Sequence, residues 1–513
     1  MNVSKQYWFD AILFVVAAAL YAPSLRYGFV GDDLIYFIGN EYIKSFDVGT
    51  ILQSGAIGAD YLPLRDLSFA FDYLLWGESP FWFHLTNVML YGVTVVAVKH
   101  LFVNLNAFLV RPEGERADTP AFLAALLFAI HPTHRDVVCS VANRGALLTV
   151  LFCILTCLSF IRYLQGTGNR SRSYATALLC SVCALLSREY SISLPLVLVL
   201  LVFFDDRSMR TSKLIATTPF FIIVLVFYFV YKQYALSANY ITSSTESLLS
   251  ESFTKLEVAV KIAGFYMVRM TTFAGKFSHA ESIIYALLAA GVVAGILNAA
   301  IILRRRQPQL LFGFLFYLIC LIPVLNLFKT DPVVAARYSY LPCLGLFFVL
   351  LAVPFVGRMK FIPILCVAFT VSWSMVTTYQ MKYYENNIVY WENIAPYTGT
   401  AYVYTQLGYA YYDGQQYEKA LESLRKVQPE PWEPKYQVTV GKACFKLGDY
   451  RCAIRSFETA MTRGADDGSV PLDLARAYLA VENRKGAEKY FDFVSRNFPQ
   501  MKDEVKMIKA SQR

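Results

Sequence analysis

Two adjacent aspartates follow the first apolar run of the chain and could do acid–base chemistry. Asp32 and Asp33 close the segment from Phe29, directly after a run long enough to cross a membrane. A carboxylate at a membrane surface can have a raised pKa and accept a proton from an incoming hydroxyl, or it can bind a divalent cation. Adjacent side chains point in different directions, so at most one of the two is expected to act as a base. The alternative interpretation is an N-cap of the following helix.

Two histidines follow the third apolar run. His131 and His134 begin a segment that reaches Asp136, and Pro132 fits a helix that stops at the mouth of a cavity. The spacing H-x-x-H without a third nearby ligand is a weak zinc signal. We therefore interpret the histidines as ligands of phosphate or of sugar hydroxyls. A plain turn at the membrane surface is the alternative.

Arginines recur near the ends of apolar runs. Arg144, Arg188 and Arg337 each lie at such an end, where a charge is costly unless it faces a partner or a water-filled cavity. Guanidinium groups match phosphate oxygens in a bidentate way, so together the three predict a cradle for a phosphate or diphosphate. Glu189 is expected to pair with Arg188 or with another of these cations. Snorkelling to lipid headgroups is the alternative for each arginine alone.

The composition indicates two regions and excludes several functions. The chain has 513 residues, of which 56% are hydrophobic, and its charged residues concentrate towards the C-terminus. The net charge of +9 comes mainly from short loops between apolar runs, so we expect no nucleic-acid partner. The sequence contains no Gly-rich nucleotide loop, nucleophile elbow or P-loop, which disfavours a soluble nucleotide donor.

The elements that must position these residues are membrane-length helices. A span needs about 20 apolar residues. We predict eleven transmembrane helices, at residues 8–25, 86–108, 119–139, 145–163, 174–187, 190–204, 214–233, 282–303, 310–328, 338–356 and 361–381. The predicted fold class is therefore all-α, a polytopic membrane helix bundle over residues 1–384.

The charge of the loops predicts the orientation of these spans. Basic loops stay on the cytoplasmic side, so the N-terminus is expected inside. The first loop, residues 27–83, and a loop at residues 234–278 that carries an interfacial helix are then expected on the exoplasmic side, together with the C-terminal part. On this topology all the candidate residues lie at one face of the membrane.

The C-terminal part contains internal repeats. Leu407 and Gly408 recur as Val440 and Gly441 after 33 residues, and a related segment from Leu474 follows after a further 34. This spacing is typical of tetratricopeptide repeats, which stack into an α-solenoid with a concave surface. We predict a linker at residues 385–400 and about three repeats at residues 401–513. Such a surface usually holds a peptide or a partner protein, and a purely structural role is the alternative.

The ten cysteines show no paired C-x-x-C spacing of a zinc site. Most of them lie in or beside apolar runs, where cysteine acts as a small hydrophobic residue. Cys444 and Cys452 lie in the repeats instead. They could form a disulfide in an oxidising compartment, or they could both remain unpaired.

The order of the motifs resembles a known family. The matching segments are residues 29–33, 61–69, 83–88, 131–138, 143–144, 187–189 and 337–342, followed by the repeats. In this order they resemble polytopic membrane glycosyltransferases of the GT-C superfamily, and within it the transmembrane, tetratricopeptide-containing O-mannosyltransferases and their bacterial relatives. The chain departs from the family pattern at Tyr91, Ala146, Ala336 and Arg188, which leaves the donor sugar open.

The resemblance implies an enzyme that takes a sugar from a polyprenyl-phosphate carrier and transfers it, with inversion, to an acceptor hydroxyl. Asp32 matches the position of the catalytic base, with Asp33 beside it. The arginines would hold the lipid phosphate that leaves, Tyr338 lies in the motif of Arg337, and the repeats would recruit an acceptor protein or glycan. The resemblance leaves metal dependence open, and Asp32 and Asp33 would be the ligands if Mg²⁺ or Mn²⁺ is bound.

The resemblance also implies a location. The chain is expected to be a multi-pass protein of the lipid bilayer, either in a bacterial inner membrane with a periplasmic active site and repeat domain, or in the ER membrane with both on the lumenal face. The alternative function is a non-catalytic membrane scaffold that recruits proteins through its repeats.

Overall fold

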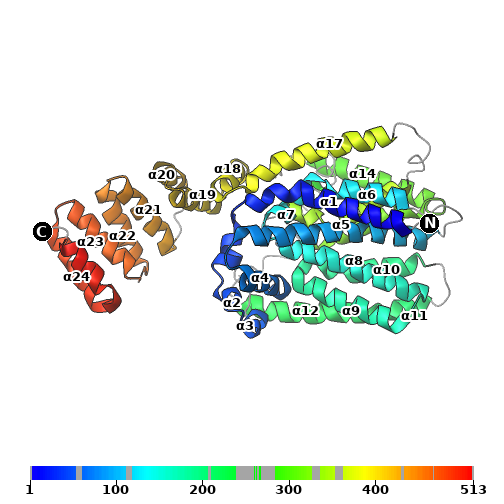
Figure 1. Ribbon diagram of the computed structural model, residues 1–513, viewed down its shortest axis with the longest axis horizontal. Coiled ribbons are helices and arrows are strands. Elements are labelled where there is room, and N and C mark those ends of the chain that lie inside the picture. The colour runs from blue at the N-terminus through cyan, green and yellow to red at the C-terminus, as the bar shows by residue number, and fades with distance from the viewer. Residues whose placement is uncertain are drawn as a thin grey trace. The chain divides into compact units, whose positions relative to one another are not determined.

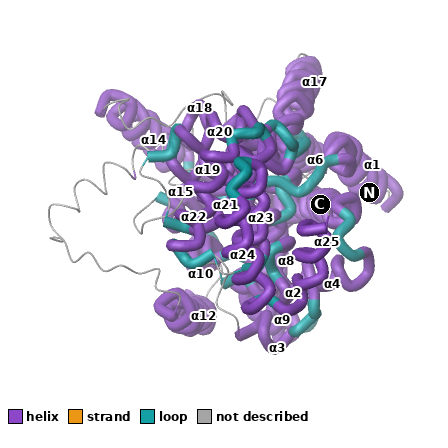
Figure 2. The backbone as a smooth tube through the Cα atoms, turned by 90° about the vertical axis from the view of Figure 1, so that its left-hand side faces the viewer, coloured by secondary structure: helices purple, strands orange, loops and turns teal. Residues whose placement is uncertain are grey.

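A computed structural model describes residues 3–53, 61–110, 118–205, 210–237, 259, 262, 265–266, 283–325, 335–352, 362–428, 432–465 and 467–510. Within these residues every regular element is a helix and no strand occurs (Figure 2). The chain divides into two compact units, Met1–Tyr384 and Glu385–Arg513. The predicted all-α fold class, a membrane helix bundle followed by a helical solenoid, is confirmed.

The first unit is a bundle of long apolar helices with short helices at one end (Figure 1). Its elements are α1 (Val3–Tyr21), η1 (Ala22–Arg26), η2 (Leu34–Ile38), α2 (Glu41–Lys44), α3 (Val48–Gln53), α4 (Pro63–Trp76), α5 (Pro80–Val110), α6 (Asp118–Ala129), η4 (Pro132–His134), α7 (Arg135–Cys139), α8 (Arg144–Gln165), α9 (Arg170–Ser187), η5 (Glu189–Ser193), α10 (Leu194–Phe203), α11 (Arg210–Ile215), α12 (Thr218–Ser237), α14 (Ile283–Leu303), α15 (Pro308–Leu321), η6 (Ile322–Val324), η7 (Ala336–Ser339), α16 (Cys343–Val349), η8 (Leu350–Ala352), α17 (Ile362–Met381) and η9 (Lys382–Tyr384).

Each of the eleven apolar runs predicted to cross the membrane contains a helix. Among the described residues, 4 helices are long and apolar enough to cross a membrane, at Gln6–Arg26, Pro80–Val110, Arg144–Gln165 and Arg210–Val230. The third predicted span is shorter than expected. Helix α6 ends at Ala129, shortly before Pro132, whose ring disfavours helical geometry in the residue before it. The tenth is also shorter, because α16 covers only Cys343–Val349.

Helices α8 and α9 run antiparallel and pack closely where α8 begins and α9 ends. A β-carbon on Gly145 would lie 2.5 Å from the carbonyl oxygen of Ser187, so the backbones could not approach in this way with a larger residue. Arg188 then leaves the helix in an extended conformation. This contact brings Arg144 and Arg188 to the same end of the bundle.

The predicted first loop is largely helical where the structure describes it. Helices α2, α3 and α4 lie at the end of the bundle where α1 ends and α5 begins (Figure 1). The buried rings of Phe37, Phe69 and Phe83 pack together and tie this layer to the start of α5. Residues 54–60 of this loop lie outside the described residues. So does most of the predicted loop at residues 234–278, and of its predicted interfacial helix at residues 258–274 only residues 259, 262, 265 and 266 are described, all of them helical.

The opposite end of the bundle carries basic residues. At the start of α9 the Tyr174 hydroxyl donates to the carbonyl of Ala216, 2.8 Å away. At the start of α15, directly after Arg304–Arg306, the Gln309 amide donates to Asn106 near the end of α5, 3.0 Å away. These helix ends are the ones remote from Gly145. The candidate site residues and these basic turns therefore lie at opposite ends.

The second unit consists of paired helices. They are α18 (Asn387–Thr398), α19 (Ala401–Asp413), α20 (Tyr417–Arg425), α21 (Pro434–Lys446), α22 (Tyr450–Thr462), α23 (Ser469–Ala480), α24 (Arg484–Asn497), η10 (Pro499–Met501) and α25 (Lys502–Ala510). The sequence predicts a linker at residues 385–400, but α18 occupies most of that range. Trp391 and Ala395 give α18 an apolar face, which is buried against Leu407 and Ala410 of α19.

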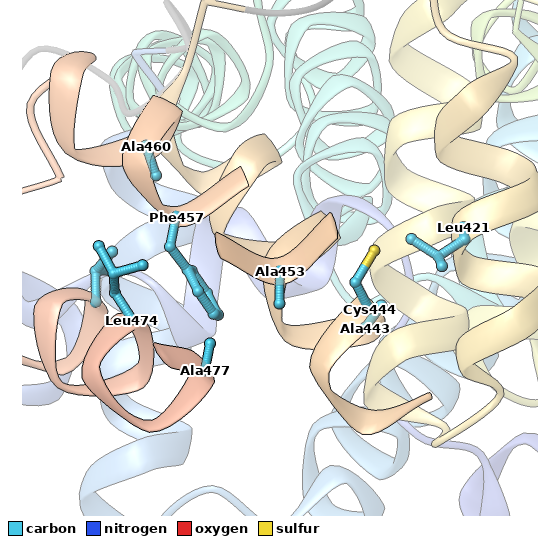
Figure 3. Packing of buried hydrophobic residues seen from close by; sticks show 9 residues of the cluster. Leu421, Ala443, Cys444, Ala453, Phe457, Ala460, Leu474 and Ala477 are labelled. Atoms are coloured by element: carbon cyan, nitrogen blue, oxygen red, sulfur yellow. The ribbon is translucent and has the colours of Figure 1, made fainter. Parts of the chain in front are cut away.

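Small residues and one aromatic ring set the packing inside this unit. A β-carbon on Gly441 would lie 2.7 Å from the Phe457 ring, so α21 and α22 cross closely at this position. The Phe457 ring points towards Leu474 and Ala477 of the next helix pair (Figure 3). The predicted repeats therefore bury their apolar faces against one another, as stacked helix pairs do.

The two cysteines of the repeats are bonded to each other. Cys444 of α21 and Cys452 of α22 form a disulfide, with their Cα atoms 5.8 Å apart. Of the two alternatives that the spacing leaves open, the structure therefore has the bridge. It links the two helices of one repeat.

Candidate functional site

Asp33 is fully buried and joins the first loop to the segment before α8. One carboxylate oxygen accepts hydrogen bonds from the Ala142 backbone N–H at 2.6 Å and from the Ser140 hydroxyl at 3.2 Å. The other accepts from the Val30 backbone N–H at 3.1 Å. Burial raises the pKa of Asp33 to about 7, although the backbone N–H groups favour the charged form. The structure gives Asp33 an anchoring role instead of the predicted catalytic one.

Asp32 lies in a different environment from its neighbour. It is half-buried, and its charge acts on the carboxylate of Asp33. Because Asp33 accepts hydrogen bonds from Val30, Ser140 and Ala142, Asp32 is the member of the pair that remains a candidate base. At most one of the two aspartates was expected to act as a base, and Asp32 is therefore the candidate.

Arg144 is enclosed by protein groups. Its Nε donates to Asn87 Oδ1 at 2.8 Å, and its terminal nitrogens donate to the carbonyl oxygens of Ser68 and Phe83 at 3.1 and 3.0 Å. One of them also pairs with Asp72 at 2.7 Å. The side chain has no exposed surface. Arg144 thus joins α4, α5 and α8, and the structure does not place it as the predicted phosphate ligand.

The two histidines lie in an aromatic core. His131 accepts from the Thr133 backbone N–H at 3.4 Å, and its ring packs edge-on against Trp373 at 4.9 Å. His134 Nδ1 lies 3.0 Å from the Tyr91 hydroxyl, and its ring packs against Phe128 at 4.4 Å. Both residues are fully buried. These contacts support a structural role, in contrast to the predicted binding of phosphate or sugar.

Arg188 and Arg337 lie within electrostatic range of the same tyrosine. The charges of Arg188, Glu189 and Arg337 all act on the buried Tyr190 hydroxyl, although Arg337 is far away in the sequence. The Arg188 side chain is 8% exposed, and its Nε lies 3.9 Å from Glu189, whose side chain is 42% exposed. Two of the three predicted arginines therefore act on the same buried tyrosine, and Glu189 lies beside Arg188.

Arg337 lies at the start of a short helix next to Asp136. Its guanidinium is 5.5 Å from the Tyr338 ring and 3.7 Å from Asp136 Oδ2, and its side chain is 12% exposed. Helix η7, which carries Arg337 and Tyr338, packs against η4 and α7. Sequence reasoning did not select Asp136, although it is the one acidic residue of the His131 segment.

Arg65 was also missed by sequence reasoning. This arginine of α4 is almost fully buried, and its guanidinium lies over the Tyr36 ring at 4.5 Å and pairs with Asp66 at 2.8 Å. Gly145 packs against the carbonyl of Ser187, and a β-carbon added to Gly145 would also lie 3.6 Å from the Arg65 side chain. Arg65 therefore lies near the segment that carries Arg188. The sequence did offer one signal for Arg65, which is a charged residue in the first turn of a helix that begins at Pro63.

The residues present do not fit a metal site built on both aspartates. Asp33 already accepts hydrogen bonds at both oxygens, which leaves it poorly suited to coordinate Mg²⁺ or Mn²⁺. Within the part of the chain that the structure describes, no group of three or more His, Cys, Asp or Glu residues could hold a metal ion.

Comparison with known proteins adds to this geometry. The chain is 28% identical over 190 residues to protein O-mannosyl-transferase TMTC4 of Mus musculus, which is 34% of this chain and 26% of that protein. It is 31% identical over 148 residues to protein O-mannosyl-transferase TMTC2 of Homo sapiens, which is 28% of this chain and 17% of that protein. The predicted resemblance to O-mannosyltransferases is confirmed.

A third relative, protein O-mannosyl-transferase Tmtc3 of Drosophila melanogaster, is 26% identical over 230 residues, which is 39% of this chain and 24% of that protein. The similarity therefore spans well under two thirds of the length of each of these relatives. No family model and no solved structure matches the chain.

Proposed function

We propose that this protein is a membrane glycosyltransferase that moves a sugar from a polyprenyl-phosphate carrier to an acceptor hydroxyl. The similarity to proteins named O-mannosyl-transferases supports the reaction class. The observation that carries the proposal is the placement of two mostly buried arginines, Arg188 and Arg337, which are 8% and 12% exposed and lie within electrostatic range of Tyr190. Two cations in one neighbourhood favour an anionic ligand, and phosphate oxygens match the guanidinium geometry in a bidentate way.

The proposed mechanism gives each residue one task. The acceptor oxygen attacks C1 of the sugar, and its proton passes to the carboxylate of Asp32. The bond between C1 and the phosphate oxygen breaks on the opposite face, so the configuration at C1 is inverted. Arg188 and Arg337 stabilise the negative charge that develops on the lipid phosphate. Asp32 later releases its proton to water.

The proposed site faces the exoplasmic side of the membrane. The basic turns before α9 and α15 lie at the end of the bundle remote from Gly145, and basic turns usually remain cytoplasmic. The site would then open to the periplasm of a bacterium or to the ER lumen. A lipid-linked donor suits this side, because soluble nucleotide sugars are made in the cytoplasm while a polyprenyl carrier stays in the bilayer.

The repeat unit has a proposed role in acceptor binding. Its stacked helix pairs form the kind of surface that holds extended peptides. We propose that it recruits the protein or glycan that receives the sugar. The names of the relatives make mannose the first sugar to test.

Replacement of Asp32 tests the proposal. We expect Asp32→Asn to lower sugar transfer by at least about a hundredfold, the usual contribution of a general base, while membrane insertion stays normal. Asp47→Asn is the matched control, because Asp47 is an exposed aspartate of the same loop, and it should retain wild-type transfer. The assay is transfer from polyprenyl-phosphate mannose and from other polyprenyl-phosphate sugars in isolated membranes.

Two results would contradict the proposal. Undiminished transfer by Asp32→Asn would remove Asp32 as the base. Wild-type membranes that transfer no sugar from any of these donors would overturn the enzymatic function and favour a scaffold that recruits proteins through the repeats.

A further inference from the structure

Asp136 connects three distant segments of the membrane unit. Its Oδ1 accepts a hydrogen bond from the Tyr384 hydroxyl at 3.0 Å and one from the Asn143 amide at 3.3 Å. Its Oδ2 accepts from the backbone N–H of Arg337 at 3.1 Å. Asp136 is 7% exposed, so these bonds form away from bulk water, where a lost partner is costly. The segments before α8, at η7 and after α17 therefore meet on one carboxylate.

The contacts of Asp136 with Arg337 differ in strength. The backbone bond has a normal length, whereas the distance from Oδ2 to the guanidinium is 3.7 Å, too long for a hydrogen bond. Asp136 thus holds the backbone of Arg337 through a hydrogen bond and adds an ion pair to its guanidinium. This arrangement fixes where the side chain starts.

Tyr384 holds the other oxygen of the carboxylate. It is buried and is the last residue of the membrane unit, directly before Glu385. An Asp carboxylate can accept all three of these donors, whereas an Asn side chain has one acceptor oxygen and would place an NH₂ group against at least one donor. The shape of the network therefore depends on a carboxylate at position 136.

We infer that Asp136 is a positioning residue that fixes Arg337 for the lipid phosphate, and that the Tyr384 hydroxyl keeps Asp136 in this position. The inference rests on the proposed function only in that Arg337 binds phosphate. It assigns no proton transfer to Asp136, because its carboxylate is already occupied by donors from the protein.

The test compares Tyr384→Phe and Asp136→Asn with Tyr379→Phe, a control at an exposed tyrosine of α17. We measure the KM for the donor, kcat, the melting temperature in detergent and the binding of polyprenyl phosphate alone. Loss of a hydrogen bond to a charged group should raise the donor KM and the dissociation constant of the lipid by about tenfold or more for Asp136→Asn, and by less for Tyr384→Phe. Asp136→Glu, which keeps the charge, should restore part of the affinity. Tyr379→Phe should match the wild type.

Each outcome separates this inference from the proposed function. Asp136→Asn and Tyr384→Phe variants that bind the lipid as well as wild type overturn the inference, even if their melting temperatures fall. If the wild type transfers no sugar, but the lipid binds it and binds Asp136→Asn about tenfold more weakly, the inference stands and the proposed function fails. If the wild type transfers sugar and both variants retain its KM, the inference alone fails. If Asp136→Asn does not fold, Tyr384→Phe decides by the same criteria.

Discussion

The two units place their charged side chains in opposite ways. The membrane unit contains fully enclosed ion pairs: Arg144 and Asp72 are 0% and 6% exposed, and Lys213 and Asp205 are 8% and 3% exposed. In the repeat unit, the pair of Lys426 and Glu422 is 50% and 69% exposed, and the interior is filled by residues such as Phe457 and Leu474.

The difference follows from the surroundings of each unit. Helices that face lipid gain little from hiding apolar side chains from one another, so polar contacts and close packing must specify which helices meet. The repeats fold in water, where burying apolar surface is itself the driving force. A buried arginine in the membrane unit therefore helps to specify which helices pack together, whereas an exposed lysine in the repeats does not.

The largest effect is expected for Arg144→Met. The change leaves Asp72 buried without its ion-pair partner, which destabilises proteins by about 3 to 5 kcal/mol. Thermal unfolding in detergent should show a marked fall in the melting temperature. Lys426→Met, the same kind of change at the exposed pair of the repeats, should leave it unchanged. Equal effects of the two substitutions would break the comparison between the units.

A smaller effect is expected when the disulfide of the repeats is removed. Replacing both Cys444 and Cys452 by Ala should destabilise the repeat unit by about 2 to 3 kcal/mol, because the bridge closes a short loop in the unfolded chain. Limited proteolysis of the full chain should show faster cleavage in the repeats and an unchanged membrane unit. Cys183→Ala, at a free cysteine of the membrane unit, is the control. Wild-type repeats whose cleavage is insensitive to reductant would argue against a bridge that stabilises them.

A third effect is the pH dependence that Asp33 causes. The pKa of Asp33 is raised by burial to about 7, above its value of 3.8 in an unfolded chain. The folded protein therefore holds a proton that the unfolded chain loses, and this contribution to stability is full below about pH 4 and lost as the pH rises through about 7. Asp33→Asn should remove this part of the pH dependence, although the variant is less stable overall. Melting curves in detergent at several pH values between these limits measure it, and Asp47→Asn should keep the wild-type slope.

The helices were largely predictable, whereas the roles of single residues were not. Apolar runs of membrane length and the repeat of Gly408 at Gly441 depend on residues close together in the sequence, so their periodicity reveals them. The sequence predicts a linker at residues 385–400, where the structure has α18. The apolar face of α18, which includes Trp391, is buried only by packing against α19, and the local sequence does not show that contact. Asp136 was overlooked for the same kind of reason, since its partners at Arg337 and Tyr384 are distant in the sequence.

The sequence by itself determined that a helical membrane bundle precedes helical repeats, and which few ionic residues the apolar half retains. Only the tertiary structure decided what those residues do. Arg144 and Arg188 look alike in the sequence, yet Arg144 is enclosed by Asn87, Ser68, Phe83 and Asp72, while Arg188 lies beside the half-exposed Glu189. The physical reason is that the energy of a buried charge depends on the partners that folding brings to it, and those partners come from other helices.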